Sequence, residues 1–331
     1  MTPSLLPPLK FHPLLKETPW GGTEILRFKH LDSSSSHVGE SWEVSDLPQN
    51  QSVVSEGSLA GRSLHELVEE YGPRLLGRQG MERHGLRFPL LIKFIDANAD
   101  LSLQVHPSDA VAHARGRASG KTEMWYVVKS RPDATLLSGW NQAVTPEAYL
   151  SHARQGTLCQ LVSRRQAPRG SCFFIPAGTV HAICSGIFLI EIQQSSDVTY
   201  RLYDYGRPGL DGRPRQLHIA EAQGALNFAP QSEVLSLEPS VEAEVSDRLL
   251  VSCPYFTTRE HHLSVPHDFE AAQSFRLLIG FDGEATVTTP GGTATLRAGE
   301  SLLLPQESST ATVSPEATGC ALLSVTEDFE A

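Results

Sequence analysis

The chain has 331 residues, of which 40% are hydrophobic and 20% are charged, proportions that are ordinary for a soluble globular protein. This length is enough for two domains with full cores. The formal net charge is −11, from 27 Lys and Arg against 38 Asp and Glu, which argues against general binding of nucleic acids or anionic membranes, since both need a basic surface. Any anionic ligand must therefore be held by a local cluster of Lys and Arg.

Targeting segments are not expected in this sequence. Residues 1–8 lack a basic region followed by a long apolar core, and no apolar run approaches the length of a membrane span. The five Cys, at positions 159, 172, 184, 253 and 320, form no Cys-x-x-Cys pair. Scattered Cys fit a reducing compartment better than a disulfide framework, so we expect a cytoplasmic protein.

Strand patterns dominate the chain. Short runs rich in Val, Ile, Leu and Phe predict strands at 38–44, 51–54, 90–95, 101–105, 123–128, 134–137, 171–175, 188–193, 275–279, 284–288 and 301–304. Apolar spacing and capping signals predict fewer helices, at 62–76, 108–117, from 145 onward and at 218–226. Residues 231–247 are acidic and poor in apolar residues, which is typical of a linker. The sequence therefore predicts a mainly β chain with inserted helices.

A weak internal repeat supports two β-rich units. Gly170 precedes Pro176 by six residues across an apolar run, and Gly299 precedes Pro305 in the same way. Each segment predicts a Gly turn, a buried strand and a Pro stop. The first is soon followed by His181, whereas no His follows the second. We therefore expect a second barrel that lacks a metal site.

Four polar side chains are candidates for one metal site. Gln104 and His106 are two residues apart in an alternating run, and alternate residues of a strand point to one face. Glu123 can approach from a neighbouring strand, and His181 follows a Pro and a Gly that let a strand end and turn. Two imidazoles, a carboxylate and an amide oxygen suit Zn, Fe, Mn, Co or Ni.

A structural role for these side chains is the alternative. The chain contains 13 His, and a His on a strand is more often solvated or hydrogen-bonded than a metal ligand. Buried Gln, Glu and His nevertheless need partners, and a shared cation supplies one. Spacing alone leaves these two interpretations balanced.

Longer motifs carry a resemblance to a known family. Residues 170–181 have the pattern Gly-x5-Pro-x-Gly-x2-His, which resembles the second signature of the cupins, small jelly-roll barrels with a metal in one mouth. Gln104, His106 and Glu123 resemble a modified first signature. The chain resembles the type I mannose-6-phosphate isomerases, especially their short bacterial form, at residues 11–22, 39–43, 88–93, 101–109, 120–126, 176–182 and 197–206.

The resemblance implies a fold, an activity and a partner. The fold is mainly β with two cupin jelly-roll barrels: residues 1–234 form a catalytic domain with helical insertions and the metal site, and residues 235–331 form a barrel without metal ligands. The activity is Zn-dependent interconversion of D-mannose 6-phosphate and D-fructose 6-phosphate through an enediol. The expected partner is a small sugar phosphate, with no nucleic acid and no membrane; monomer and homodimer both stay open.

The resemblance also implies site residues, position by position. It implies that one Zn²⁺ per chain is bound by Gln104, His106, Glu123 and His181. Three further residues match catalytic or pocket positions of the family and are assigned to catalysis: Arg201, Lys121 and Glu191. Two more match residues that line the substrate pocket: Lys93 and Ser102.

The chemistry of the residues fits this assignment but leaves alternatives. Isomerisation needs a base, a proton route between two oxygens and positive charge near the oxyanion. Arg201 offers a planar fork of donors to phosphate or to an enediolate, or else forms a salt bridge with Asp197 or Asp204. Lys121 lies two residues before Glu123, so on a strand it shares the face that meets the metal. It can move protons or pair with phosphate.

Lys93 and Glu191 lie within apolar runs, an unusual setting for charges. Lys93 either packs its stem on the barrel with its head in water or meets a phosphate or carboxylate inside the pocket. Glu191 is a candidate acid or base whose pKa burial would raise, or a hydrogen-bond partner of Arg201. Ser102 shares the strand face of Gln104. The sequence does not decide which group removes the C2 proton.

Two other functions stay open at this point. Two His and one Glu resemble the facial triad of non-haem Fe oxygenases, and a sugar-phosphate-binding cupin without turnover would need the same basic residues. Where longer family members place a Tyr after the motif His, this chain has Ile183 and Cys184. Three other His match no motif and are expected on the surface: His113, His261 and His262.

Overall fold

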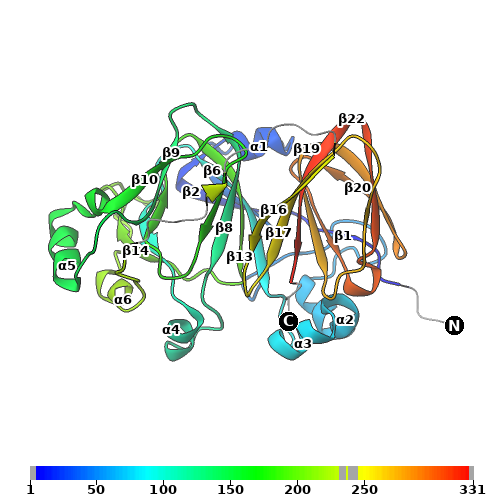
Figure 1. Ribbon diagram of the computed structural model, residues 1–331, viewed down its shortest axis with the longest axis horizontal. Helices are drawn as coiled ribbons and strands as arrows, with labels where there is room; N and C mark the ends of the chain where they lie inside the picture. The colour runs from blue at the N-terminus through cyan, green and yellow to red at the C-terminus, as the bar shows by residue number, and fades with distance from the viewer. Residues whose placement is uncertain (1–4, 231–235, 238–244, 328–331) are drawn as a thin grey trace.

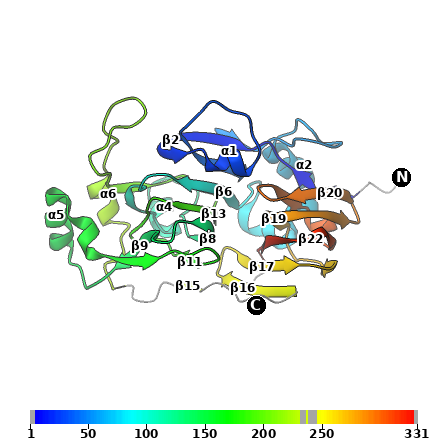
Figure 2. The same cartoon turned by 90° about the horizontal axis from the view of Figure 1, so that it is seen from above.

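The computed structural model describes residues 5–230, 236–237 and 245–327. Antiparallel strands form sheets of eight, seven, five and two strands, and short helices lie between them. Figures 1 and 2 show two β-rich halves side by side, one with the green strands and one with the orange and red strands. The mainly β prediction is confirmed.

Two of the sheets make up the first half. The seven-stranded sheet has the order β15 (Ser236–Leu237), β11 (Cys172–Ile175), β8 (Glu123–Ser130), β13 (Ile187–Gln194), β6 (Leu90–Ala97), β3 (Val38–Val44) and β2 (Leu14–Gly22). The five-stranded sheet has the order β10 (Val162–Gln166), β9 (Thr135–Trp140), β12 (His181–Ile183), β7 (Leu103–Val105) and β14 (Tyr200–Tyr203). A small ladder joins β4 (Asp46–Leu47) to β5 (Asn50–Gln51).

The eight-stranded sheet makes up the second half. Its path is β1 (Leu9–Lys10), β21 (Ser301–Leu304), β19 (Arg276–Thr289), β22 (Ala311–Thr326), β17 (Thr257–Leu263) and β16 (Val245–Ser252), with β18 (His267–Phe269) on β22 and β20 (Gly292–Arg297) on β19. The N-terminal β1 pairs with β21 of the second half, and β15, which lies between the two halves in the sequence, pairs with β11 of the first half.

The predicted domain boundary lies in a region that the structure covers only in part. Of the predicted linker at 231–247, residues 231–235 and 238–244 fall outside the described residues, while β15 and the start of β16 lie within it. The division into 1–234 and 235–331 therefore stays a prediction.

The helices are short and cover the strands from outside. They are α1 (Glu24–Phe28), α2 (Leu64–Leu76), α3 (Arg78–His84), α4 (Asp109–Ala114), α5 (Pro146–Gln155) and α6 (Ile219–Gln223), with 3₁₀ turns η1 (Leu158–Leu161) and η2 (Gln306–Ser308). A capping box starts α2, because the Ser63 hydroxyl accepts from the Glu66 backbone N–H while the Glu66 carboxylate accepts from that of Ser63. Over the described part of the chain, no helix is both long and apolar enough to cross a membrane.

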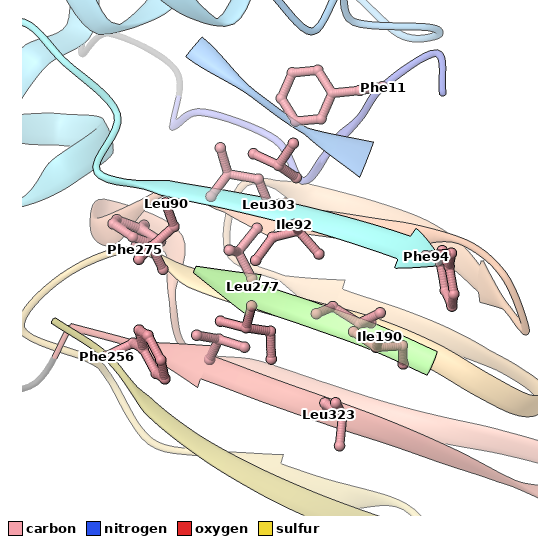
Figure 3. Packing of buried hydrophobic residues seen from close by; sticks show 14 of the residues in the cluster. Phe11, Leu90, Ile92, Phe94, Ile190, Phe256, Phe275, Leu277, Leu303 and Leu323 are labelled. Atoms are coloured by element: carbon pink, nitrogen blue, oxygen red, sulfur yellow. The ribbon is translucent and has the colours of Figure 1, made fainter. Parts of the chain in front are cut away.

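Alternation along β6 explains how charges come to lie in an apolar run. Leu90, Ile92 and Phe94 point into a core shared by both halves, where they meet residues such as Phe275 of the second half (Figure 3). Because successive strand residues face opposite sides, Lys93 points away from this core. The outer face of the seven-stranded sheet is therefore an apolar interface between the halves, and its inner face is free to carry polar groups.

One surface prediction is wrong. His261 lies on β17 and is 1% exposed, whereas His113 is exposed and His262 is half-buried. The His261 ring packs edge-on against Phe269, with ring centres 4.9 Å apart, and its Nε2 hydrogen-bonds with the Ser324 hydroxyl at 2.8 Å. The polar run around His261 gives no sign in the sequence that alternate side chains enter a core.

Candidate metal centre

The predicted metal ligands meet between the two sheets of the first half. Gln104 on β7 is the direct register partner of His181 on β12, and on its other side it is paired with Arg201 on β14. His106 follows β7 by one residue, and Glu123 begins β8 in the facing sheet. Cross-strand partners have adjacent side chains, so antiparallel pairing brings together residues that are far apart in the sequence.

Three of these side chains converge as metal ligands do. The ligand atoms of His106, Glu123 and His181 all lie within 4.8 Å of one another, and all three residues are buried. His106 Nε2 is 3.6 Å from Glu123 Oε2, and His181 Nε2 is 3.5 Å from Glu123 Oε1. Nitrogen and carboxylate oxygen atoms at this spacing surround a space in which a small divalent cation fits.

Backbone carbonyls orient both imidazoles. His106 Nδ1 lies 2.8 Å from the Val198 carbonyl, and His181 Nδ1 lies 2.9 Å from the Thr179 carbonyl. A carbonyl can only accept, so in each ring Nδ1 carries the proton and donates it. The lone pair of each Nε2 then points toward Glu123, which is the arrangement typical of His residues that bind a metal.

Gln104, the fourth predicted metal ligand, lies next to the imidazole rings of His106 and His181. Its amide nitrogen lies 3.3 Å from His181 Nε2 and 3.5 Å from His106 Nε2, while its Oε1 accepts from the Ser102 hydroxyl at 3.3 Å. A half-turn of the amide exchanges its nitrogen and oxygen and would bring the oxygen to the two rings. Gln104 is therefore within reach of a fourth ligand position.

The buried carboxylate of this cluster keeps one oxygen atom unpaired, which is the test of whether a metal cation fits. Glu123 Oε1 is buried and has no hydrogen-bond partner among the described residues. Burial, and then repulsion from Glu191, raises the pKa of Glu123 to about 7. Burial also lowers the pKa of His181 to about 4 and that of His106 well below its usual range. Neutral imidazoles beside an unpaired carboxylate oxygen fit a metal cation.

Lys121 is the cation nearest to the ligands. Its ammonium contacts the Glu123 carboxylate and lies 3.0 Å from His106 Nε2 and 3.7 Å from Glu191 Oε1. Lys121 precedes β8 rather than lying on a strand as predicted, yet its side chain and that of Glu123 face the same site. A buried ammonium between two carboxylates and an imidazole can hold or pass on a proton.

Lys93 and Glu191 are direct cross-strand partners on β6 and β13. Lys93 Nζ lies 3.1 Å from Glu191 and 3.4 Å from Glu40, and the Lys93 side chain is 7% exposed, so its head is not in bulk water. Burial alone would raise the pKa of Glu191, but attraction to Lys121 and Lys93 outweighs it and lowers that pKa to about 2. Glu191 accepts a hydrogen bond from Trp125 Nε1 at 2.9 Å rather than from Arg201.

Arg201 does not form the salt bridge considered as its alternative role. Its Nη1 donates to the Gln216 carbonyl at 2.9 Å, and its Nε is buried without a hydrogen-bond partner among the described residues. Asp204 is instead paired with Arg207 and Arg215. Burial, and then the nearby Arg215, lowers the pKa of Arg201 from its very high ordinary value.

A cavity of about 130 Å³ opens onto this group of residues. It is lined by six of the predicted site residues, namely Lys93, Ser102, Gln104, Lys121, Glu191 and Arg201. The sequence interpretation missed eight residues that also line it: the apolar Ile95, Leu101 and Ile183, and Thr18, Trp20, Glu40, Thr199 and Arg215. Trp20 and Glu40 lie in motifs that carried the family resemblance, and this was the available signal for them.

A larger cavity, about 570 Å³, lies between the two halves and does not include these residues. Its histidines are paired with buried carboxylates, His65 with Asp46 at 3.1 Å and His84 with Glu327 at 2.8 Å. These contacts give each of the two histidines a partner within the protein. The smaller cavity is therefore the candidate active site.

Two family models match the chain. Phosphomannose isomerase type I, catalytic domain, matches residues 9–134, and mannose-6-phosphate isomerase, cupin domain, matches residues 247–321. The metal-site residues Gln104, His106 and Glu123 fall within the first match. The second match lies in the eight-stranded sheet.

Similar proteins cover nearly the whole chain. Mannose-6-phosphate isomerase ManA of Bacillus subtilis is 35% identical over 300 residues, which is 90% of this chain and 93% of that protein. Mannose-6-phosphate isomerase of Streptococcus mutans is 34% identical over 86% of this chain and 88% of its own length. The crystal structure of the Bacillus subtilis mannose 6-phosphate isomerase superposes with a TM-score of 0.87 at 29% identity, covering 96% of this chain and 99% of the other. The predicted resemblance is confirmed, and the chain belongs to the type I mannose-6-phosphate isomerase family.

Proposed function

We propose that this protein interconverts D-mannose 6-phosphate and D-fructose 6-phosphate, moving a proton between C1 and C2 through an enediol. The observation that carries the proposal is the buried group of His106, Glu123 and His181, whose ligand atoms lie within 4.8 Å of one another. This group lies beside a cavity that Lys93, Lys121 and Arg201 line. The activity named for the similar proteins supports the same reaction.

One Zn²⁺, held by Gln104, His106, Glu123 and His181, is the cofactor we propose. When bound, it would stabilise negative charge on the sugar oxygens without redox chemistry. Two neutral imidazoles, a carboxylate and an amide oxygen are ligands that zinc accepts. The unpaired Glu123 Oε1 supports a cation at this position.

The remaining site residues divide the work of binding and proton transfer. Lys121 and Glu191 lie 3.7 Å apart, line the cavity and can exchange protons, so we assign proton movement at C1, C2 and their oxygens to this pair. Arg201 keeps a buried donor, Nε, without a partner among the described residues, and in this role it offsets the charge of the enediolate. Lys93 and Ser102 bind substrate from the cavity wall.

The low pKa of Glu191 favours Lys121 as the proton donor of the pair, because the Lys121 ammonium can give a proton to a sugar oxygen. A carboxyl group with a pKa of about 2 is ionised at neutral pH and is a weak base for a carbon acid. In this arrangement the Glu191 carboxylate keeps both Lys121 and Lys93 in place by charge attraction. The main effect of Glu191 is then to favour the protonated forms of Lys121 and Lys93.

The proposed setting is the cytoplasm, with a sugar phosphate as the partner. All five Cys are free thiols, which supports a reducing compartment. The acidic net charge of −11 supports a small ligand that is captured locally rather than a nucleic acid or an anionic membrane.

An activity assay with metal analysis tests the proposal. We expect the purified protein to convert mannose 6-phosphate to fructose 6-phosphate, a chelator to abolish the conversion, and added Zn²⁺ to restore it. The variant Arg201→Ala should lose at least about a hundredfold in kcat while it still binds one Zn²⁺, because Arg201 acts on the transition state and not on the metal.

The exposed Arg213 offers a matched control, and Arg213→Ala should keep the parent rate. An unchanged rate in Arg201→Ala would remove Arg201 from the mechanism. Stoichiometric iron with oxygen consumption would favour the oxygenase alternative, and Zn²⁺ binding without any turnover would favour a sugar-phosphate-binding protein.

A further inference from the structure

A cluster of arginines closes one side of the candidate active site. Asp204 follows β14 and is 5% exposed. Arg215 donates to it through Nε at 2.7 Å and through Nη2 at 2.6 Å, and Arg207 donates through Nε at 3.1 Å and Nη2 at 2.8 Å. Arg215 bonds to both carboxylate oxygens, and two parallel hydrogen bonds of this kind fix the plane of a guanidinium, whereas both Arg207 donors share Oδ1.

Arg215 and Arg207 share Asp204 but differ in what they face. Arg215 lines the cavity of the active site together with Arg201. Among the described residues that line the cavity, Arg207 does not occur. Its guanidinium lies instead 5.6 Å from the centre of the Tyr205 ring. The two residues therefore form a natural pair of test and control.

The cluster carries more positive charge than its own partner balances. Three guanidinium groups, of Arg201, Arg207 and Arg215, stand against the single carboxylate of Asp204, which leaves two positive charges. The chain as a whole has a net charge of −11, so this excess is local. A phosphate monoester carries about −1.5 to −2 charges at neutral pH and is attracted to this side of the site, where Arg215, but not Arg207, lies on the cavity wall to contact it.

Unused hydrogen-bond donors accompany this charge. A guanidinium has five N–H donors, and the two bonds to Asp204 leave Arg215 with others to offer the cavity. Attraction to Arg215 and Arg207 outweighs the effect of burial and lowers the pKa of Asp204, so the carboxylate stays ionised and keeps its hold. Arg215 is thus a preformed donor at the cavity wall.

We propose that Arg215, oriented by Asp204, binds the phosphate group of the substrate and so sets the preference for phosphorylated over free sugars. This inference rests on the proposed function. Arg201 is paired in register with Gln104 and so lies next to the metal-ligand candidates, whereas Arg215 comes from the loop after β14. The two arginines then act on opposite ends of the sugar phosphate, Arg201 at the reacting carbons and Arg215 at the phosphate.

Steady-state kinetics with two substrates tests this assignment in the metal-loaded enzyme. For Arg215→Met we expect the KM for mannose 6-phosphate to rise about 10- to 100-fold with kcat within about threefold of the parent, because a charge-assisted contact made in both ground and transition states is lost. The kcat/KM for free mannose should stay within about threefold. Arg207→Met should change neither substrate's constants by more than about threefold, and Arg215→Lys should fall between Arg215→Met and the parent.

Titration calorimetry with inorganic phosphate gives a readout that does not depend on turnover. The affinity for phosphate should fall at least about tenfold in Arg215→Met and stay at the parent value in Arg207→Met. Equal phosphate affinity in the parent and Arg215→Met would overturn the inference, as would an equal loss of kcat/KM for mannose and mannose 6-phosphate. If the protein showed no isomerase activity but lost phosphate affinity in Arg215→Met, the proposed function would fail while Arg215 kept its phosphate-binding role.

Discussion

The segments Gly170 to Pro176 and Gly299 to Pro305 have the same local structure in the two halves of the molecule. The two Gly residues have positive φ angles, +82° and +87°, and a four-residue strand follows in each half, β11 or β21. After the Pro, the first segment leads into β12 at His181, and the second leads into the short 3₁₀ turn η2. A shared turn and strand therefore lead to a metal-ligand candidate in one half only.

The interiors of the two halves also differ, because polar side chains are buried around the candidate metal site of the first half and apolar side chains fill the inner face of the second. In the first half, buried Lys, Glu and His side chains lie within hydrogen-bond or ion-pair distance of one another around the candidate metal site. In the second half, the inner face of the eight-stranded sheet buries apolar side chains such as Leu278, Leu302 and Leu322. Buried charges cost stability unless they are paired, whereas buried Leu side chains supply it. Changes in the first half should affect activity, and changes in the second should affect stability.

The largest effect should come from removing the carboxylate of the first half. Glu123→Gln keeps nearly the same volume but loses the negative charge that faces both histidines. We expect Zn²⁺ content to drop and kcat/KM to fall at least about a thousandfold, equivalent to about 4 kcal/mol of transition-state stabilisation. Metal analysis and the isomerase assay measure both, with the exposed Glu82→Gln as control. If Glu123→Gln kept the metal content and the activity of the parent, the buried charges of the first half would not be needed for catalysis, and the proposed difference between the halves would be wrong.

Apolar strands were predictable from the sequence, and polar strands were not. The run at 90–95 gave β6, because both faces of that strand are buried and most of its residues are apolar. The prediction missed β17, which contains Arg259, Glu260 and His261. Glu260 is buried because it meets Arg248 on the neighbouring strand and Tyr126 from the other half. Partners of this kind come from distant segments, so the local pattern does not contain them.

The site was predictable where one strand presents its own alternation. Gln104 and His106 followed from spacing, and their convergence with His181 followed from the motif. Glu40 and Arg215 were missed, because Glu40 reaches Lys93 across neighbouring strands and Arg215 reaches the cavity from a loop fixed by Asp204. Strand register and loop path depend on tertiary structure, which a single sequence does not specify.

A smaller effect, on stability rather than activity, should follow from a cavity in the second half. Leu278 is fully buried on β19, and Leu278→Ala should lower the free energy of unfolding by about 3 kcal/mol, within the usual range for such a change. Activity per folded molecule should stay within about twofold. Urea unfolding of the purified protein measures the loss, and Leu249→Ala, at a side chain 46% exposed, is the matched control. A tenfold loss of kcat in folded Leu278→Ala would show that the second half shapes the active site.

The smallest expected effect concerns His261, the buried histidine of the second half. Burial lowers its pKa to about 4, although Asp247, 3.7 Å away, opposes the shift; the other charged or titratable groups around it are His267, Arg259 and Arg276. The folded protein therefore holds His261 neutral at a pH where the unfolded chain, with an ordinary His pKa near 6.5, binds a proton. Its contribution to stability is complete above about pH 6.5 and is lost as the pH falls toward 4.

Replacing His261 with Gln should remove this pH dependence, because Gln can still hydrogen-bond with Ser324 but does not titrate. Between pH 7 and pH 5, the free energy of unfolding of the parent should fall by about 2 kcal/mol more than that of His261→Gln. His106 and His181 are present in both proteins, so their protonation and metal release cancel in the difference. Urea unfolding at the two pH values measures it, with the exposed His113→Gln as control. Equal pH slopes for the parent and His261→Gln would mean that the second half accommodates a protonated His261, and its interior would then be less different from the metal-site half than the buried leucines indicate.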